Sequence, residues 1–313
     1  MSAVKSATCR ICGVRGEMET YQLREVMFKT FETFDYQFCP ACQSMQIENV
    51  PDDLHRHYPR NYYSLGDRKS SGIIHSIRSA GLRYGVDGKS LVGRLLSWTG
   101  RLPSDVTWIQ ACAPDLNWRV LDVGCGRGDR LMELSLAGFQ NLTGIEPFIE
   151  KDIEIGPNLR IKRGVLDELT GEFDLVMLHH SLEHVVAPTE TMRHVERLLS
   201  KDGKALIRVP VMGKWAWRTY GLDWVQLDAP RHLYQFSEQG IAALARSAGL
   251  RVRKVVYDSF EFQMYESERI RAYRVNGQDI PRHTKAQLAQ FKKRSKELNQ
   301  ASDGDQACFV LTR

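Results

Sequence analysis

Short apolar runs alternate with longer stretches of helical spacing along the last two thirds of the chain. The run Phe173–Leu178 is apolar at most positions, as in a strand that is buried on both faces of a sheet. Strands separated by helices favour a parallel α/β sheet. The pattern predicts seven strands, at Arg119–Val123, Asn141–Glu146, Leu159–Arg163, Phe173–Leu178, Lys204–Val209, Val252–Tyr257 and Gln306–Thr312.

Helix signals lie between these strands. Pro188 suits the first turn of a helix, Ser237 can cap one, and Gly249 can end one. Helices are predicted at Asp129–Ala137, Pro188–Ser200 and Ser237–Ala248. Together the two patterns predict an α/β fold with a seven-stranded, doubly wound, Rossmann-like sheet.

The first 118 residues have a different character. Residues 1–50 contain two Cys-x-x-Cys pairs and short apolar stretches, whereas residues 51–118 show weak periodicity with many Tyr, Ser, Gly and Arg. We therefore predict three parts: a small metal-binding module at 1–50, a helical or loop connector with a candidate role as substrate cover at 51–118, and the sheet domain at 119–313.

Four cysteines of the first part have the spacing of metal ligands. Cys9 and Cys12 form one pair and Cys39 and Cys42 the other, with room for a β-hairpin at residues 20–38 between them. Four thiolates are the tetrahedral ligand set of a closed structural Zn²⁺ site. Redox pairs and buried free thiols are the alternatives, and a redox pair would call for a thioredoxin-like fold around it.

Composition narrows the class of protein. The chain has 313 residues, of which 42% are hydrophobic and 26% charged, so wholesale disorder is excluded. No apolar run approaches the ~18–20 residues of a membrane span. No secretory signal follows the first residues, so we expect a cytoplasmic protein.

The chain has a net charge of +5, and its excess of basic residues is concentrated in one segment. Residues 68–101 contain seven Lys or Arg and a single acid, whereas the basic residues of the Cys-rich module are balanced by acids, so nucleic acid is not expected as a partner. The apolar residues of this basic segment have helical spacing, which predicts a helix packed across the sheet edge. Peripheral contact with an anionic membrane is the alternative. The apolar residues are Ile73, Ile77, Leu91, Leu95 and Trp98.

A glycine-rich segment, VLDVGCGRG at residues 120–128, follows the first predicted strand and opens a helix. Open α/β sheets bind ligands at this end of their strands. Gly124, Gly126 and Gly128 allow a tight turn and close approach of a ligand to the backbone. The spacing differs from the Gly-x-Gly-x-x-Gly of dinucleotide sites, and Asp129 would repel a pyrophosphate, so we expect a ligand without phosphates.

Two acids accompany this turn. Asp122 lies in the strand just before it, where a carboxylate can meet a cationic group, and Glu146 ends the second strand. An acid at that strand end can accept hydrogen bonds from both ribose hydroxyls of an adenosine. These segments resemble motifs of the class I S-adenosylmethionine-dependent methyltransferases. The resembling segments are VLDVGCGRGD, GIEPF (144–148), FDLVMLHHSLEHV (173–185) and LLSKDGKALIRVP (198–210).

The resemblance covers about residues 115–260 and implies that the chain binds S-adenosylmethionine. It implies that Asp122 and the three glycines hold the methionine part and Glu146 the ribose. Many members carry an acid in the region of Asp167 that binds the adenine amine. The alternative is that Val165 and Leu166 cover the adenine ring. The implied cofactor-binding residues are Asp122, Gly124, Gly126, Gly128, Glu146, Pro147, Asp167 and His179.

Methyl transfer to a hydroxyl calls for a proton acceptor, and histidine serves best near neutral pH. His180 and His184 follow the fourth strand, and His232 lies in the loop after the fifth strand, which in this family overhangs the acceptor. These three are the candidate catalytic residues, with a core or surface role as the alternative for each. Four aromatic residues of the second loop form either a wall for a sugar ring or a packed core: Trp215, Trp217, Tyr220 and Trp224.

A four-Cys module ahead of a methyltransferase domain is similar to bacterial sugar methyltransferases, and so is the tyrosine-rich stretch at 57–64. We therefore expect an S-adenosylmethionine-dependent enzyme with structural Zn²⁺. Its expected acceptor is a sugar hydroxyl of a nucleotide-linked sugar, glycan or polysaccharide. The alternatives are a methyltransferase of RNA or protein with the module as reader, and a binding protein without catalysis. The sequence gives no indication of oligomeric state.

Overall fold

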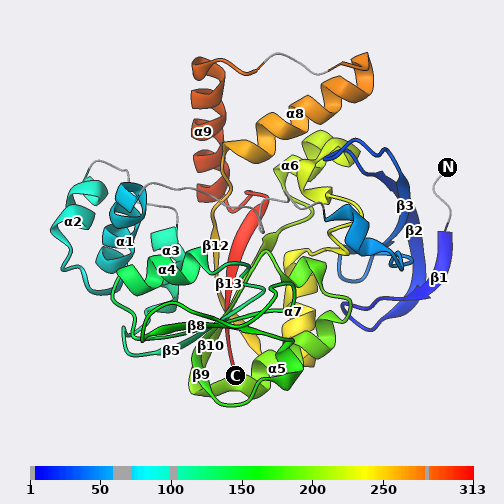
Figure 1. The fold of residues 1–313 in the computed structure, drawn as a ribbon. Coiled ribbons are helices and arrows are strands. Elements are labelled where there is room, and N and C mark those ends of the chain that lie inside the picture. The colour runs from blue at the N-terminus through cyan, green and yellow to red at the C-terminus, as the bar shows by residue number, and fades with distance from the viewer. Residues whose placement is uncertain (1–3, 59–71, 99–104, 279–281) are drawn as a thin grey trace.

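The structure, a computed structural model, describes residues 4–58, 72–98, 105–278 and 282–313 (Figure 1). Its centre is a sheet with the strand order β12-β13-β10-β9-β5-β6-β8-β7. The strands from β10 to β8 run parallel, and β13 and β12 at one edge add antiparallel pairs. The bounds are β5 Arg119–Val123, β6 Asn141–Glu146, β7 Ile153–Glu154, β8 Leu159–Arg163, β9 Phe173–His179, β10 Leu199–Pro210, β12 Arg251–Tyr257 and β13 Gln306–Thr312.

The predicted fold class is confirmed, because all seven predicted strands belong to this sheet. Several bounds differ from the prediction, and two differences affect the sheet. The two-residue β7 extends the sheet beyond β8 by antiparallel pairing. The helix predicted at Pro188–Ser200 ends at Leu198, because the backbone of Leu199 already pairs with Phe173 of the neighbouring strand.

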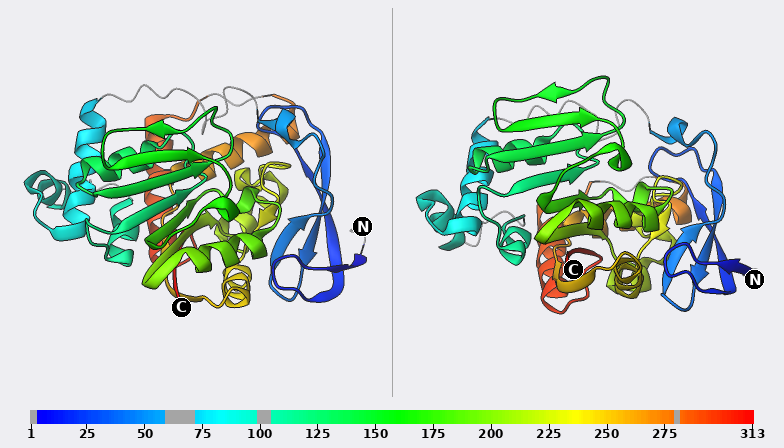
Figure 2. Two further views of the ribbon diagram at one scale, coloured as in Figure 1. Left: turned by 60° about the horizontal axis from the view of Figure 1, so that its bottom comes forward. Right: turned by 90° about the horizontal axis from the view of Figure 1, so that it is seen from below.

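Helices cover both faces of the sheet (Figures 1 and 2). Buried side chains of α1, α3 and α4 form a core on one face. Those of α5 and α7 form a second core on the other face, and this core continues into the N-terminal module. The helices are α1 Gly72–Asp87, α2 Leu91–Trp98, α3 Asp105–Cys112, α4 Asp129–Leu136, α5 Pro188–Leu198, α6 Trp215–Tyr220, α7 Glu238–Ser247, α8 Glu261–Asn276 and α9 Lys285–Gln300.

The N-terminal module is a small antiparallel sheet, drawn in blue in Figure 1. Its order is β1-β2-β3-β4-β11, and the hairpin expected within residues 20–38 is present as β2 and β3. The last strand belongs to the loop that follows β10 of the large sheet, so this loop completes the module. The bounds are β1 Val4–Thr8, β2 Arg15–Arg24, β3 Thr33–Cys39, β4 Ser44–Ile47 and β11 Tyr234–Gln235.

The described part of the basic segment, residues 72–98, contains two helices that differ in their surroundings. Leu82 of α1 is buried, and Arg83 donates a hydrogen bond to the carbonyl of Ala137 at the end of α4, so α1 packs against α4 on one face of the sheet. On α2, by contrast, Leu91 and Trp98 are 73% and 88% exposed. No helix in the described ranges has the length and apolar character needed to cross a membrane.

Helices α8 and α9 were not predicted. Their burial rests on a few side chains, such as Met264 and Leu298, so they lack a strong apolar stripe. The local signal for α9 is a capping box, in which Thr284 and Gln287 bond to each other's backbone.

Candidate active site

The glycine turn joins β5 to α4 and has the conformation that its sequence predicts. Gly124 and Gly128 have φ values of +71° and +85°, a region that other residues rarely adopt. A Cβ at Gly124 would lie 2.8 Å from Cβ of Ser181, and one at Gly128 would lie 2.5 Å from Cδ1 of Ile161. The turn therefore needs glycine for its backbone angles and for its close contact with the loop after β9.

The structure brings Glu146 to this turn. The carboxylate is buried, and its Oε2 accepts a hydrogen bond of 2.9 Å from the backbone N–H of Gly126. Oε1 accepts a second bond, of 3.2 Å, from the N–H of Phe148. The predicted acid and the predicted glycine turn therefore form one unit at the carboxyl ends of β5 and β6.

Asp122 is buried below the same turn. Among the described residues, its Oδ1 has no hydrogen-bond partner. Burial raises the pKa of Asp122 to about 7, although the nearby Arg130 acts in the opposite direction. A buried carboxyl oxygen without a partner is costly, so this position suits a ligand that brings a hydrogen-bond donor or a cationic group.

The next strand ends carry exposed side chains. Pro147 and Phe148 follow β6, and the Phe148 side chain is 75% exposed. Val165 follows β8 and is 45% exposed, and Asp167 is exposed in the short 3-10 helix Leu166–Glu168. Sequence reasoning did not single out Phe148, whose exposed ring lies two positions after the predicted acid.

His179 and His180 lie in different surroundings. The His179 ring is 4.9 Å from the ring of Trp108 on α3, a neighbour that the sequence did not indicate. His180 has a φ of +49°, and its Nδ1 lies 3.0 Å from Oε1 of Glu183. Burial lowers the pKa of His180, while this carboxylate opposes the shift.

The other two candidate catalytic histidines, His184 and His232, lie side by side. The rings of His184 and His232 lie 4.8 Å apart between centroids. Nδ1 of His184 is 2.9 Å from the carbonyl of Arg231, and Nδ1 of His232 is 2.7 Å from the carbonyl of Gln226. The hydroxyl of Tyr58 also lies 3.1 Å from Nδ1 of His184. Because a carbonyl only accepts, each Nδ1 donates to its carbonyl, and in the neutral ring the lone pair is then on Nε2.

Glu183 lies beside both rings and is fully buried. Burial opposes its ionisation, but the hydrogen bond from His180 and the neighbouring imidazoles lower the pKa of Glu183 to about 2. Burial and the adjacent His232 lower the pKa of His184 to about 4. Near neutral pH this cluster therefore contains a charged carboxylate beside a neutral imidazole.

The N-terminal module holds the loop that carries His232. The hydroxyl of Tyr36 in β3 donates a hydrogen bond of 2.8 Å to the carbonyl of His232. Arg231 is fully buried, and it bonds to Asp228 in the loop and to Glu25 at the end of the β2–β3 hairpin. The candidate catalytic loop is thus fixed from the side of the Cys-rich module.

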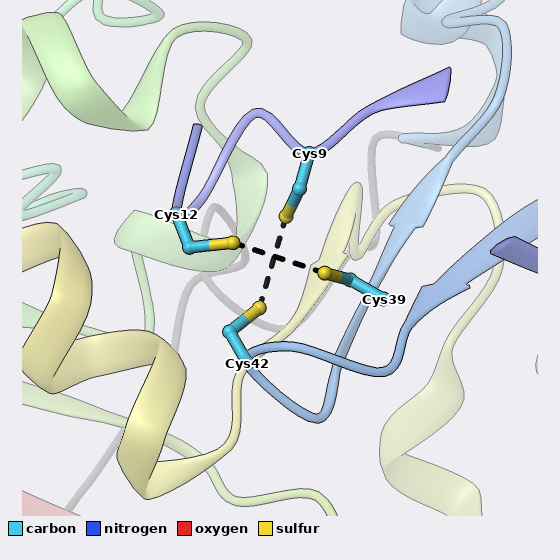
Figure 3. Close-up of side chains that lie close together, drawn as sticks. All are labelled: Cys9, Cys12, Cys39 and Cys42. Carbon is cyan, nitrogen blue, oxygen red and sulfur yellow. Dashed lines mark hydrogen bonds between the residues drawn. The ribbon is translucent and has the colours of Figure 1, made fainter. Parts of the chain in front are cut away.

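The four cysteines of the module converge on one point (Figure 3). Sγ of Cys9 lies 3.7 Å from Sγ of Cys42, and Sγ of Cys12 lies 3.8 Å from Sγ of Cys39. Thiolates at the corners of a tetrahedron 2.3 Å from a Zn²⁺ would be about 3.8 Å apart. The spacing and the donor set therefore both fit a zinc ion.

The aromatic residues after β10 are largely buried. Trp224 is 1% exposed and donates a hydrogen bond of 2.7 Å to Asp305, and Tyr220 is 5% exposed. Trp217 packs edge-on against Trp224 and against Tyr21 of β2. This arrangement favours the packed core over the wall for a sugar ring. Tyr62 and Tyr63, which belong to the tyrosine-rich stretch at 57–64, lie outside the described residues.

The glycine turn and the two acids lie together as the resemblance to S-adenosylmethionine-dependent methyltransferases implies, and the chain is a methyltransferase of this class. The chain belongs to the methyltransferase domain family, whose sequence model matches residues 92–255. It is 27% identical over 172 residues to the ubiquinone biosynthesis O-methyltransferase of Pseudomonas aeruginosa. The aligned region covers 49% of this chain and 73% of that protein. It is 32% identical over 169 residues to the Bordetella bronchiseptica protein of the same name, covering 47% and 68%.

The fold is also similar to a solved S-adenosylmethionine-dependent methyltransferase from Mesorhizobium loti. The sequence identity is 17% and the TM-score 0.45, with 67% of this chain and 98% of that one covered.

Proposed function

We propose that this methyltransferase moves the methyl group of S-adenosylmethionine to a hydroxyl oxygen of a small molecule, with His180, His184 and His232 at the acceptor. The observation that carries this proposal is the position of the Nε2 lone pairs of His184 and His232. They belong to the loops after β9 and β10, and the loop after β9 also touches the glycine turn through Ser181. The relatives named above carry O-methyltransferase names, which supports oxygen as the acceptor atom.

The chain's own residues would hold the cofactor in a fixed orientation. Asp122 would take the ammonium group of the methionine part, and Glu146 the ribose hydroxyls. Phe148 and Val165 would cover the adenine ring, with Pro147, Asp167 and His179 at the same strand ends. The bound cofactor supplies an activated methyl group on its sulfonium. The hydroxyl oxygen forms a bond to that methyl carbon as the carbon–sulfur bond breaks, and the hydroxyl proton leaves to a base or to solvent.

The sugar acceptor stays a prediction, and a panel of acceptors tests it. Transfer of a labelled methyl group would be measured with nucleotide sugars, glycans and hydroxylated compounds of ubiquinone biosynthesis. Label in a sugar product supports the sugar acceptor, whereas label only in the ubiquinone-related compounds contradicts it. A chain that binds the cofactor and labels no hydroxyl compound contradicts the proposed O-methylation.

We expect Glu146→Ala to weaken S-adenosylmethionine binding by about 1.5–3 kcal/mol, because a charge-assisted acceptor is lost. The same change removes two hydrogen bonds that hold the turn. Glu146→Gln keeps the size and one carbonyl oxygen, so it should lose less. Calorimetric titration of both variants decides the matter, and an unchanged dissociation constant for Glu146→Ala would refute the ribose role.

The raised pKa of Asp122 predicts a pH-dependent penalty in the cofactor-free chain. Its folded pKa of about 7 exceeds the ordinary value of about 3.9, so between these values the folded chain binds more protons than the unfolded chain and stability falls as pH rises. Asp122→Asn removes this penalty and should be more stable than wild type by about 2–4 kcal/mol at pH 8. The advantage should shrink at pH 5. Urea unfolding at both pH values measures it, and an equal difference at the two would contradict the assignment.

For the module we propose a structural Zn²⁺ on Cys9, Cys12, Cys39 and Cys42. Such a closed site stabilises a small sheet that has little core of its own. The ion would also hold the turn between β3 and β4 that supports α7, since the carbonyl of Cys42 accepts a hydrogen bond from Ser237, the N-cap of that helix.

One thiolate-bound Zn²⁺ per chain is therefore expected. It should be released when a mercurial reagent blocks the thiols, and Cys39→Ser should lose it. Cys308→Ala, a change in buried β13 outside the module, should keep it. Metal analysis that finds no thiol-dependent zinc in freshly reduced wild-type protein would rule the site out.

A further inference from the structure

Glu183, His184 and His232 come from two loops, and their ligand atoms all lie within 4.8 Å of one another. The Nδ1–H groups of both histidines are held by backbone carbonyls, which fixes the ring orientation and leaves Nε2 to bind something else. Histidines that bind metal ions in proteins have this arrangement, in which the second nitrogen donates to a carbonyl or carboxylate.

The carboxylate of Glu183 provides a second, independent observation. Oε1 bonds to His180, but Oε2 has no hydrogen-bond partner within the part of the chain that the structure describes. The residue is fully buried. A buried charged oxygen without a partner is strongly unfavourable, so this oxygen calls for a ligand.

The surrounding charges point to a cation. The buried guanidinium of Arg231 bonds two buried carboxylates, those of Glu25 and Asp228. Asp228 also lies 3.9 Å from Nε2 of His232. The carboxylates of Glu183 and Asp228 therefore both lie at the His184–His232 pair, and carboxylate oxygens beside imidazole nitrogens are ligands that a divalent cation takes.

We propose that Glu183, His184 and His232 bind one divalent first-row transition ion next to the cofactor turn. Two imidazoles and one carboxylate form the ligand set of catalytic Zn²⁺ and of non-haem Fe²⁺ sites, and such a set leaves open positions. The role of the ion rests on the proposed function: an open position takes the acceptor hydroxyl, and its pKa falls because the oxygen is bound to a cation. In the loaded chain His232 is a ligand through Nε2, so the acceptor proton leaves to solvent.

The test uses the full chain with its thiolate site filled with Zn²⁺, titrated with Co²⁺ alone, without cofactor or acceptor. We expect one Co²⁺ per chain with visible bands of nitrogen and oxygen ligation, no sulfur charge-transfer bands and no release of Zn²⁺. Glu183→Gln keeps the size of the side chain and should weaken Co²⁺ binding about tenfold or more, as for the loss of a ligand-shell interaction. His194→Ala, on α5 outside the cluster, is the matched control and should bind as wild type does.

Wild-type protein that binds no Co²⁺ beyond its Zn²⁺ would overturn the site, whatever the variants do. Unchanged Co²⁺ affinity in Glu183→Gln that retains Zn²⁺ and a native circular dichroism spectrum would overturn it too. If that variant does not fold, the test is repeated with His184→Ala. A chain that binds Co²⁺ and transfers no methyl group contradicts the proposed function but supports the site. Full turnover after a chelator has removed the Co²⁺ and left the Zn²⁺ contradicts the role of the ion in the reaction.

Discussion

Replacing His232 with alanine is expected to lower methyl-transfer turnover roughly 10²–10⁴-fold, the usual worth of a group that activates the acceptor. The reason is geometric. Nδ1 of His232 is occupied by the carbonyl of Gln226, so Nε2 is the nitrogen that can accept a proton or hold an ion. Cofactor affinity should barely change, because the acids proposed to bind the cofactor, Asp122 and Glu146, belong to β5 and β6 and not to this loop.

Variants of two other histidines are the controls for this prediction. His180→Ala removes the bond to Oε1 of Glu183 and should reduce turnover less than His232→Ala. His194→Ala should leave turnover unchanged. If His180→Ala abolishes turnover while His232→Ala keeps more than about a tenth of it, the wrong histidine has been assigned. Mild effects of both would mean that positioning alone drives the transfer.

The second large effect concerns stability. Arg231→Met should destabilise the chain by about 3–5 kcal/mol, because it leaves buried carboxylates without their counter-charge. Asp228 and Glu25 both bond to this guanidinium, and the exposed fraction of its side chain is 0%. The Arg231 charge lowers the pKa of Asp228 despite its burial, which shows that the pair stabilises the ionised form.

An exposed ion pair provides the control for this measurement. Arg193 pairs with Glu190 on the surface of α5, where both side chains are more than half exposed. Arg193→Met should change the free energy of unfolding by less than about 0.5–1 kcal/mol. Urea unfolding of both variants tests the difference, and similar losses in the two would show that the buried network does not hold the module to the loop.

Much of the fold follows from local sequence signals. The strands β5 and β9 are mostly apolar because both of their faces are covered, so their positions can be predicted from the sequence alone. Ser237 was predicted as an N-cap, and its hydroxyl accepts the bond from the N–H of Gly240. The contact between Glu146 and Gly126 likewise agrees with the order of the motifs along the chain.

What the sequence does not reveal depends on contacts between distant segments. Arg231 is fully buried although arginine is usually exposed, because its partner Glu25 lies 206 positions away in the chain. The meeting of His184 with His232 also depends on how two loops fold together. Trp108 precedes the first motif, and only the packing of α3 on the sheet brings it to His179.

The pairing of β4 with β11 has a consequence for synthesis of the chain. The hydroxyls of Ser44 and Ser237, which bond at this junction, are separated by 193 positions. At the usual translation rates of about 5–20 residues per second, the edge of β4 would stay unpaired for roughly 10–40 s until β11 has been synthesised. Throughout that interval the nascent module presents an open strand edge, a template for pairing with other chains. The nascent chain is therefore most prone to misassembly before the loop around residue 235 has left the ribosome.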